Sequence, residues 1–541
     1  MKTRECVNWL WVASKGVRGR VVACSVTGSM HIAASLVFVW SCKKLIDAVT
    51  VDSDGSITWY IVIMISCMFA QTIFSAIETR VMNNADILLK NQLRHGIFSG
   101  LMGSRWDGRD NFHTGDSLNR VMEDVRVVGE SVTKSVPALI VSGCQFIAAF
   151  FFLFSLNREL AWVIPALMLV MLLVSKSYIL RMRRLTRDIR TTESAMQTLM
   201  QESLQHRVVI HTLEKTPYMT DNLASQQECL RGQVMDRTDY SIFARSMVQI
   251  GFAAGYAAAF LWGVFGIRNG VATFGMMTAF LQLVGQIQRP IMNLSRQFPS
   301  FINSLTSAER LSEITSLPSE DKGESVLLGQ KIGISFEDVT FAYPDSYVPV
   351  LSDFSCNFTP GTTTALVGET GVGKSTMMRL MLALLSPDKG RVRFYSDDSS
   401  VEASPQTRCN IIYVPQGNTL MSGTIRENLL LGNPVATEEE LRAVLHLAAA
   451  DFVLEFPDGM DTLCGENGTG LSEGQAHRIC IARSLLRKGG ILLLDEPTAA
   501  LDPQTEEILL KRLLGSSAGR TVIIVTHRES AISSCENVVR L

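Results

Sequence analysis

Six apolar stretches of membrane-spanning length lie in the first 312 residues of this 541-residue chain. A helix needs roughly 20 apolar residues to cross the ~30 Å hydrocarbon core of a bilayer. Only helices and closed barrels satisfy all backbone polar groups in lipid, and stretches of this length favour helices. The predicted spans are Val21–Ser41, Ile57–Ile77, Val136–Leu156, Leu160–Tyr178, Met247–Ile267 and Val271–Gln288.

The composition agrees with a chain that is partly dissolved in lipid. It is 47% hydrophobic and 19% charged, whereas soluble domains carry roughly 25% charged residues. The net charge of −2 gives no support for a nucleic-acid partner. The eleven cysteines show no CxxC spacing, which predicts free thiols rather than a disulfide or zinc framework.

The connections between the predicted spans alternate in length, and the long ones carry most of the basic residues. The loops after the second and fourth spans are long, and basic clusters at Arg18–Arg20 and Arg181–Arg190 lie next to span ends. The positive-inside rule therefore predicts a cytoplasmic N-terminus and two long cytoplasmic loops. The loops contain little proline or glycine and predict helices that continue into the cytosol. We expect a multi-pass protein of the plasma or inner membrane that is surrounded by lipid.

A phosphate-binding motif opens the second half of the chain. The stretch Gly368–Thr376 reads G-E-T-G-V-G-K-S-T and lies between a predicted strand, Thr363–Val367, and a helical run, Met377–Leu385. This strand–loop–helix context is what the motif requires. Backbone N–H groups and the helix N-terminus would hold phosphates, Lys374 would bridge the β- and γ-phosphates, and Ser375 would bind Mg²⁺. The predicted ATP contacts in this stretch are Gly368, Thr370, Gly371, Gly373, Lys374, Ser375 and Thr376.

Polar residues also follow two further predicted strands. Asp495 and Glu496 follow Ile491–Leu494, and His527 follows Thr521–Val525. Two acids at the end of a buried strand are costly without a cation, so Asp495 is expected to hold Mg²⁺. Glu496 would be the general base for an attacking water. A lone histidine is usually a solvated surface side chain, but its place after this strand favours contact with the γ-phosphate.

These patterns predict an α-helical transmembrane domain of six spans followed by an α/β P-loop ATPase domain. The predicted boundaries are 1–312 for the membrane domain, 313–333 for a polar linker and 334–541 for the nucleotide-binding domain.

Several further motifs resemble those of ABC transporters. The resemblance includes the signature motif at Gly470–Gln475, the Q-loop at Tyr413–Gln416, the D-loop at Ala500–Asp502 and the A-loop at Phe341–Pro344. Six spans with two long cytoplasmic loops are similar to the exporter type, as are Phe112–Asp116 and Ala308–Leu311. The chain is thus similar to a half-transporter, with one six-helix membrane domain and one nucleotide-binding domain.

The resemblance implies ATP-driven export of a small amphipathic substrate (lipid, peptide or drug-like) by alternating access. Two ATPase domains would close around two ATP molecules, so a second half-transporter is required, either in a homodimer, the simpler reading, or in a heterodimer. Closure would pass to the membrane through the loop tips at Trp106–His113 and His211–Met219.

The resemblance also assigns roles to individual residues. Tyr343 would stack on adenine, Gln416 would join Ser375 and Asp495 at Mg²⁺, and Gln416, Glu496 and His527 would act in catalysis. The remaining ATP contacts implied are Ser472, Gly474, Gln475 and Asp502. The chain departs from the family pattern at Glu473, where glycine is usual, and at Ala476-His477-Arg478, where Arg-Gln-Arg is usual.

Two alternatives to export stay open, and the substrate is not defined by the sequence. One is an importer built on the exporter plan, and the other is an ATP-gated channel or regulatory membrane protein. Glu496 argues against a pure switch, which needs no hydrolytic base. A polar stripe of the sixth span, Gln282, Gln286, Arg289, Asn293 and Gln297, lies on one helical face and is either a substrate-facing wall or a wet vestibule. His31, within the first span, either contacts substrate or a proton, or bonds a neighbouring helix.

Overall fold

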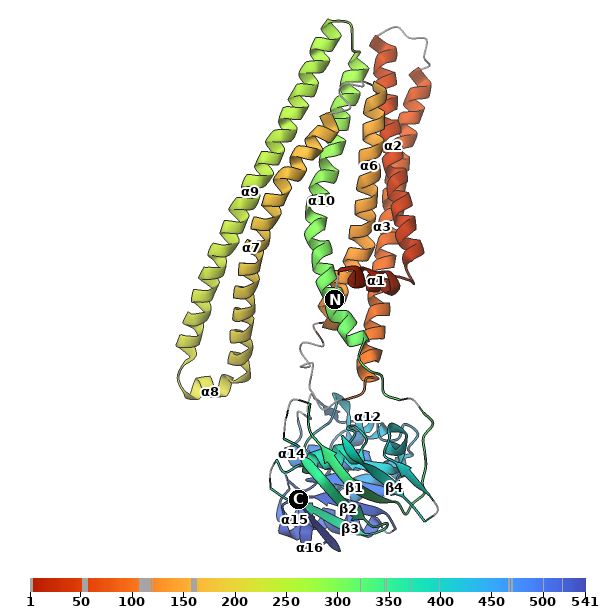
Figure 1. Cartoon of the computed structure of the whole chain (residues 1–541), viewed down its shortest axis with the longest axis vertical. Helices are drawn as coiled ribbons and strands as arrows, with labels where there is room; N and C mark the ends of the chain where they lie inside the picture. Colours follow the sequence, from red (N-terminus) through yellow and green to blue (C-terminus); the bar gives the residue numbers. More distant parts are fainter. Residues whose placement is uncertain are drawn as a thin grey trace. The chain divides into compact units, whose positions relative to one another are not determined.

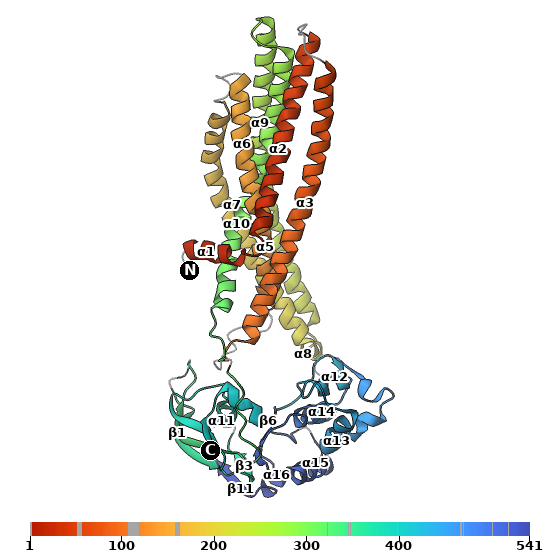
Figure 2. The same ribbon diagram turned by 90° about the vertical axis from the view of Figure 1, so that its right-hand side faces the viewer.

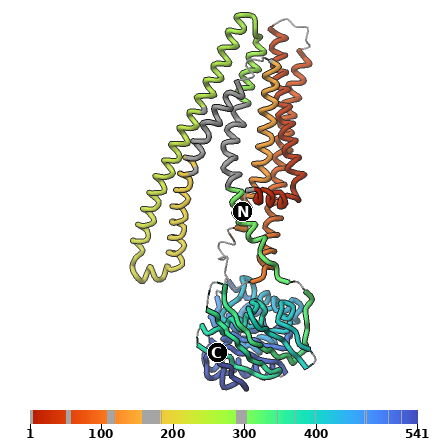
Figure 3. Tube along the Cα trace, viewed as in Figure 1, coloured from red at the N-terminus to blue at the C-terminus, as the bar shows by residue number. Residues whose placement is uncertain are grey.

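The structure is a computed structural model. It describes the chain except residues 1–2, 51–56, 107–117, 119, 157–162, 322, 345, 347, 370, 398, 466–467, 469, 500 and 518, and it describes the backbone alone at 3, 156, 163–180, 183, 248 and 287–302 (Figure 3). Its contacts divide the chain into two compact units. Unit 1 comprises Met1–Ser99 and Thr114–Thr315, and unit 2 comprises Gly100–His113 and Ser316–Leu541.

Unit 1 is built from long helices (Figure 1). They are α1 (Thr3–Ala13), α2 (Arg18–Thr50), α3 (Ile57–Met102), the π-helical η1 (Arg120–Asp124), α5 (Val125–Glu130), the π-helical η2 (Ser131–Ser135), α6 (Val136–Leu156), α7 (Val163–Gln205), α8 (Arg207–Thr212), α9 (Thr216–Arg268) and α10 (Phe274–Thr315). The lengths of α3, α7 and α9 are 46, 43 and 53 residues. These far exceed the roughly 20 residues needed to cross a bilayer, which confirms the prediction that the long loops are helical.

Four helical stretches of the described residues are long and apolar enough to cross a membrane. They are Arg18–Thr50, Ile57–Met102, Arg120–Ser155 and Thr216–Arg268. Three of them contain a predicted span in full, and Arg120–Ser155 contains all of Val136–Leu156 except its last residue. The other two predicted spans, Leu160–Tyr178 and Val271–Gln288, fall largely on α7 and α10, where part of the side chains lie outside the described residues.

The helices of unit 1 form a packed group and an arm. Helices α2, α6 and α10 pack on one another, and their core includes Val39, Phe146 and Leu283. Helices α7 and α9 run side by side, are joined by α8, and pack on α10 through α9 (Figure 1). The short helix α1 packs against α10, where the Trp9 indole N–H donates to the Thr315 hydroxyl at 3.3 Å.

Unit 2 is an α/β structure with two main sheets (Figure 2). The antiparallel sheet has the order β2-β1-β4-β5, and the parallel sheet has the order β11-β3-β10-β9-β6. The strands are β1 (Gly333–Phe341), β2 (Leu351–Phe358), β3 (Thr363–Val367), β4 (Lys389–Tyr395), β5 (Ser400–Glu402), β6 (Ile411–Val414), β7 (Gly423–Thr424), β8 (Leu463–Cys464), β9 (Ile491–Asp495), β10 (Thr521–Val525) and β11 (Asn537–Arg540). The helices are α11 (Lys374–Met381), η4 (Pro405–Asn410), α12 (Ile425–Leu430), α13 (Glu438–Leu447), η5 (Asp451–Glu455), η6 (Gly459–Asp461), α14 (Glu473–Leu485), α15 (Pro503–Ser516) and α16 (Glu529–Ser533).

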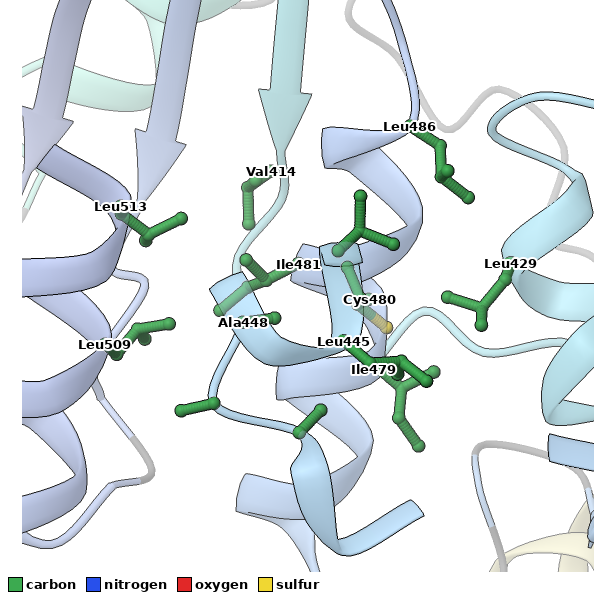
Figure 4. Packing of buried hydrophobic residues seen from close by; sticks show 14 of the residues in the cluster. Val414, Leu429, Leu445, Ala448, Ile479, Cys480, Ile481, Leu486, Leu509 and Leu513 are labelled. Atoms are coloured by element: carbon green, nitrogen blue, oxygen red, sulfur yellow. The ribbon is translucent and has the colours of Figure 1, made fainter. Parts of the chain in front are cut away.

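Two apolar cores hold unit 2 together. One lies between the parallel sheet and α13, α14 and α15, and Figure 4 shows Val414, Leu445, Ile481 and Leu509 pointing into it. The other joins both sheets to α11 and includes Phe358, Phe394 and Met377, none of which is exposed. All eleven cysteines are free thiols, as predicted.

The register of the parallel sheet brings four chain segments to one edge. Val525 pairs with both Leu366 and Asp495, and Val414 pairs with Leu494. The carboxyl ends of β3, β10, β9 and β6 therefore meet at the same edge, where ligands bind in sheets of this kind. The segments that follow these four strands carry the predicted phosphate-binding loop, His527, Glu496 and Gln416.

The boundary between the two units, after Thr315, falls within the predicted linker at 313–333. Helix α10 continues to Thr315, and the described residues that follow pack within unit 2. There the Val326 N–H donates to the Gln406 carbonyl at 3.0 Å, and the Leu328 N–H donates to Asn410 Oδ1 at 2.9 Å. The described part of this polar segment is therefore attached to the second unit along its length.

Candidate functional site

The phosphate-binding loop lies between β3 and α11, as predicted. Gly371 and Gly373 adopt φ angles of 89° and 115°, a region that residues with a Cβ rarely enter. The Lys374 ammonium donates to the carbonyls of Gly368 at 2.6 Å and Glu369 at 2.8 Å. The lysine is thus held over the loop, as the predicted contact with phosphate requires. Thr370 lies outside the described residues.

Three predicted catalytic side chains gather beyond the ends of β6, β9 and β10. Gln416 Nε2 donates to Glu496 Oε2 at 2.9 Å, and His527 Nδ1 lies 3.6 Å from Glu496 Oε1. Glu496 has a φ of 48°, in the left-handed region that a glutamate rarely adopts. Strained backbone of this kind clusters at functional sites, and here it accompanies the carboxylate expected to act as the base.

Asp495 is the buried acid of the site. It is 7% exposed, and burial together with the neighbouring Glu496 raises its pKa to about 6, while Arg379 and Lys374 oppose the rise. A buried carboxylate of this kind favours a bound cation. The hydroxyl of Ser375, the amide of Gln416 and the carboxylate of Asp495 are oxygen ligands suited to Mg²⁺.

The predicted adenine-stacking tyrosine is held next to α11. The Tyr343 hydroxyl lies 3.2 Å from Thr376 Oγ1 and accepts a hydrogen bond from Arg379 at 2.9 Å. Its ring packs edge-on against Phe341, with 5.1 Å between ring centroids. Sequence reasoning missed Arg379, although it lies three residues after Thr376, on the same face of the helix.

The signature and D-loop residues lie at helix N-termini. Ser472 precedes α14, where its hydroxyl accepts from the Gln475 N–H at 3.2 Å and its own N–H donates to Gln475 Oε1 at 2.9 Å. Gly474 lies in the first turn of α14, and Glu473 precedes it at a position where the helix dipole favours an acid. Asp502 caps α15, and the N–H of Thr505 holds the pKa of Asp502 below its usual range.

His477 is buried one turn after the signature motif. It is 1% exposed, and neither ring nitrogen has a hydrogen-bond partner among the described residues. Burial lowers its pKa, while the Pro415 backbone and Glu473 act in the opposite direction. The sequence reveals the replacement of the usual glutamine, but its burial against the Q-loop depends on the tertiary fold.

Of the membrane candidates, Gln282 and Gln286 lie at helix–helix contacts. Gln286 Nε2 donates to Ser35 Oγ at 2.8 Å, and Gln145 Nε2 donates to the Gln286 carbonyl at 2.9 Å. Gln282 faces Cys42 of α2, and its Oε1 is buried without a hydrogen-bond partner among the described residues. These contacts join α10 to α2 and α6. The side chain of Arg289 lies outside the described residues, as do those of Asn293 and Gln297.

His31 has an acidic neighbour that the sequence did not suggest. Glu78 of α3 lies within electrostatic range of His31 and of Cys24 on α2. Its Oε1 is 3.1 Å from where a Cβ on Gly28 would be, so Gly28 leaves room for the carboxylate. Glu78 was missed because the predicted second span ends one residue before it.

Comparison with known proteins identifies both halves of the chain. The family described as ABC transporter transmembrane region matches residues 21–291, and the family described as ABC transporter matches residues 351–499. The first match covers about half of the chain.

Individual relatives agree with these family matches. The ATP-dependent lipid A-core flippase of Desulfotalea psychrophila is 28% identical over 92% of this chain and 87% of its own length. The cyclolysin secretion/processing ATP-binding protein CyaB of Bordetella pertussis is 36% identical over 49% of this chain and 38% of its own length. The leukotoxin translocation ATP-binding protein LktB of Mannheimia haemolytica is 28% identical over 87% of this chain and 66% of its own length. The chain thus spans less than two thirds of the last two relatives.

A solved structure shows the same fold. The structure of a bacterial Atm1-family ABC exporter with ATP bound superimposes with a TM-score of 0.82 at 23% identity, covering 97% of this chain and 93% of the other. Fold and family matches agree on a helical membrane domain followed by an α/β ATPase domain. The chain therefore belongs to the ABC transporter family, with a helical membrane domain of the exporter fold followed by one ATPase domain.

Proposed function

We propose that this chain exports an amphipathic molecule across a membrane, driven by ATP hydrolysis in a dimer of half-transporters. The observation that carries this proposal is the contact of Gln416 and His527 with Glu496, next to the buried Asp495. A protein that uses ATP binding only as a switch has no need of a placed general base. The geometry therefore favours a pump over a gated channel or a regulatory membrane protein.

Each side chain of the site has a chemical task in this proposal. Lys374 and the loop N–H groups hold the phosphates, and Tyr343 stacks on adenine. Glu496 takes a proton from water as the water oxygen attacks the γ-phosphorus and the bond to the β-phosphate oxygen breaks. Gln416 orients Glu496, and His527 contacts the γ-phosphate. Mg²⁺ held by Ser375, Gln416 and Asp495 would neutralise phosphate charge.

A second chain completes each ATP site in this proposal. Ser472, Gly474 and Gln475 lie at the N-terminus of a 13-residue helix, α14, where backbone N–H groups favour an anion. This end would meet the γ-phosphate held by the partner, with Asp502 nearby. A homodimer is the simpler arrangement because Gln416, Glu496 and His527 are all present in this chain, and a heterodimer remains the alternative.

The tip of the arm formed by α7 and α9 supports docking on a partner. Leu204 and Val208 are 74% and 76% exposed, and Leu213 and Tyr218 are also exposed. Apolar side chains grouped at the end of an arm favour a protein contact. We assign this tip to the ATPase domain of the second chain, where it would receive the closing motion.

The substrate class that we propose rests on the names of the relatives and not on a defined pocket. The names of the relatives indicate a lipid A-core flippase and proteins of toxin secretion or translocation. These cargoes support a lipid or peptide substrate for this chain. Among the membrane candidates whose side chains the structure describes, His31 with Glu78 has ionisable groups, whereas Gln282 and Gln286 lie at helix contacts.

The test is ATPase activity of the purified protein in nanodiscs, measured across a panel of lipids, peptides and drug-like amphiphiles. We expect stimulation by one class, and loss of turnover in Lys374→Ala and Glu496→Gln. Uptake into vesicles of known orientation distinguishes export from import. Full hydrolysis by Glu496→Gln, or by a stable monomer, would contradict the proposal.

A further inference from the structure

The segment Gly100–Trp106 is fixed against the described part of the predicted linker. The Glu320 N–H donates to the Gly103 carbonyl at 2.9 Å, and the Arg105 N–H donates to the Pro318 carbonyl at 2.9 Å. Two nitrogens of the Arg408 guanidinium donate hydrogen bonds to the Glu320 carboxylate, at 2.8 and 2.6 Å. This short segment, which continues directly from α3, is therefore anchored within unit 2.

The anchoring places an aromatic ring on an arginine of the phosphate-loop helix. The Arg379 guanidinium carbon lies 4.8 Å from the centroid of the Trp106 ring. This is within the ~6 Å range of a cation–π contact, and the best ring for that contact is tryptophan. Trp106 and Tyr343 also pack against the same apolar core of unit 2.

The same arginine holds the adenine-stacking tyrosine. Arg379 donates to the Tyr343 hydroxyl at 2.9 Å, and that hydroxyl also contacts Thr376. The Arg379 charge also opposes the rise that burial causes in the pKa of Asp495, so this charge reaches the proposed Mg²⁺ ligand. The position of the Arg379 guanidinium thus affects the orientation of Tyr343 and the electrostatic field at the proposed ATP site.

We propose that Trp106 is a positioning residue for ATP: it restrains Arg379, and Arg379 restrains Tyr343 beside the phosphate-binding loop where adenine is bound. This inference rests on the proposed function, because it assumes that Tyr343 receives adenine. Trp106 follows the last residue of α3 by only four positions. Displacement of the segment Gly100–Trp106 would therefore loosen Tyr343 and lower the affinity for ATP.

Fluorescence tests whether Trp106 senses the nucleotide. Trp106 is the single tryptophan in the residue ranges of unit 2, and the other six are Trp9, Trp11, Trp40, Trp59, Trp162 and Trp262. In full-length Glu496→Gln protein, which retains bound nucleotide, Mg-ATP is expected to change the tryptophan emission. Adding Trp106→Phe should abolish most of that change. An equal change in both proteins would overturn the proposal.

Kinetics test whether Trp106 acts through Tyr343. Trp106→Leu keeps apolar packing but removes the aromatic face, and it should raise KM for ATP about threefold to tenfold, with a smaller effect on kcat. Trp106→Phe should restore most of the affinity. In a Tyr343→Ala background, Trp106→Leu should add little, because the residue through which it acts is gone.

A matched control separates this effect from general damage. Trp11 stacks on Arg18 at 3.9 Å in unit 1, so Trp11→Leu removes a similar contact and should leave KM for ATP unchanged. An unchanged KM in Trp106→Leu, or equal rises with and without Tyr343, would refute the inference alone. Failure of the unmodified protein to bind and hydrolyse ATP would instead refute the proposed function.

Discussion

His477 shows how one buried side chain makes stability depend on pH. Burial lowers the pKa of its ring in the folded protein and so favours the neutral form. In the unfolded chain the ring takes up a proton near its ordinary pKa of about 6.5. The unfolded state therefore binds more protons as the pH falls below that value, and the folded state loses stability.

We predict that His477→Gln reduces this loss of folding stability at low pH. Between about pH 7.5 and pH 5.5, the melting temperature of the variant should fall less than that of the unmodified protein. Each kcal/mol by which the two proteins differ in their loss of unfolding free energy corresponds to a difference of roughly 2–4 °C. Thermal unfolding of the full chain at several pH values measures the difference. Parallel curves for the two proteins would show that His477 does not titrate in this range.

Glu496 gives a second prediction at the residue scale. Glu496→Gln keeps the size of the side chain and its position beside Gln416, but the amide cannot accept a proton from water. We expect the hydrolysis rate to fall about 10²–10⁴-fold, the usual contribution of a general base, while ATP stays bound. Steady-state hydrolysis and nucleotide retention measure the two effects. A variant that releases ATP as it loses turnover would indicate a binding role instead.

At the scale of elements, the α10–α2 contact predicts coupling between Gln286 and Ser35. Interhelical hydrogen bonds in membranes average about 0.6 kcal/mol. Gln286→Leu and Ser35→Ala should each destabilise the protein slightly, and the double variant should lose less than the sum. Unfolding in detergent measures the cycle. If Gln286→Leu changes substrate stimulation while Ser35→Ala does not, Gln286 faces substrate instead.

Helix α8 gives a prediction for the arm tip. Val208→Asp places a charge on a side chain that is 76% exposed, so stability should change by no more than about 0.5 kcal/mol. Substrate-stimulated hydrolysis should nevertheless fall, because the docking surface loses apolar area. Val208→Ala is the milder comparison and should retain most of the stimulation. Full substrate stimulation of ATP hydrolysis in Val208→Asp would show that this tip does not couple the membrane domain to the ATPase domain.

The elements themselves could be predicted because their signals are local. An apolar run of membrane-spanning length predicted the first and last residues of α6. Short apolar runs likewise predicted the positions of β3 and β10. The phosphate-binding loop carries its own sequence pattern. These features depend on neighbouring residues, whose spacing the sequence displays directly.

The remaining features depend on contacts between distant parts of the chain. Trp106 and Arg379 meet although 273 positions separate them, Glu78 lies beside His31 on another helix, and His477 is buried against the Q-loop. The contact of Gln286 with α2 also could not be predicted. A polar stripe shows which residues share a helical face but not which helix that face contacts.

At the scale of the whole molecule, the proposed mechanism places each ATP site between two chains. Lys374 of one chain and Ser472 of the other would hold the same nucleotide. A mixed dimer with Lys374→Ala on one chain and Ser472→Ala on the other therefore keeps one site intact. A dimer with both changes on one chain and an unmodified partner has a lesion in each site.

Nucleotide trapping by these two dimers shows whether one ATP site is built from two chains. Both are prepared with differently tagged chains in the Glu496→Gln background, which blocks turnover, and are incubated with Mg-ATP in nanodiscs. We expect the dimer with the changes on separate chains to trap ATP at its intact site, and the dimer with both changes on one chain to trap none. The reverse pattern would show that each chain binds ATP with its own signature motif and would rule out a site shared between two chains.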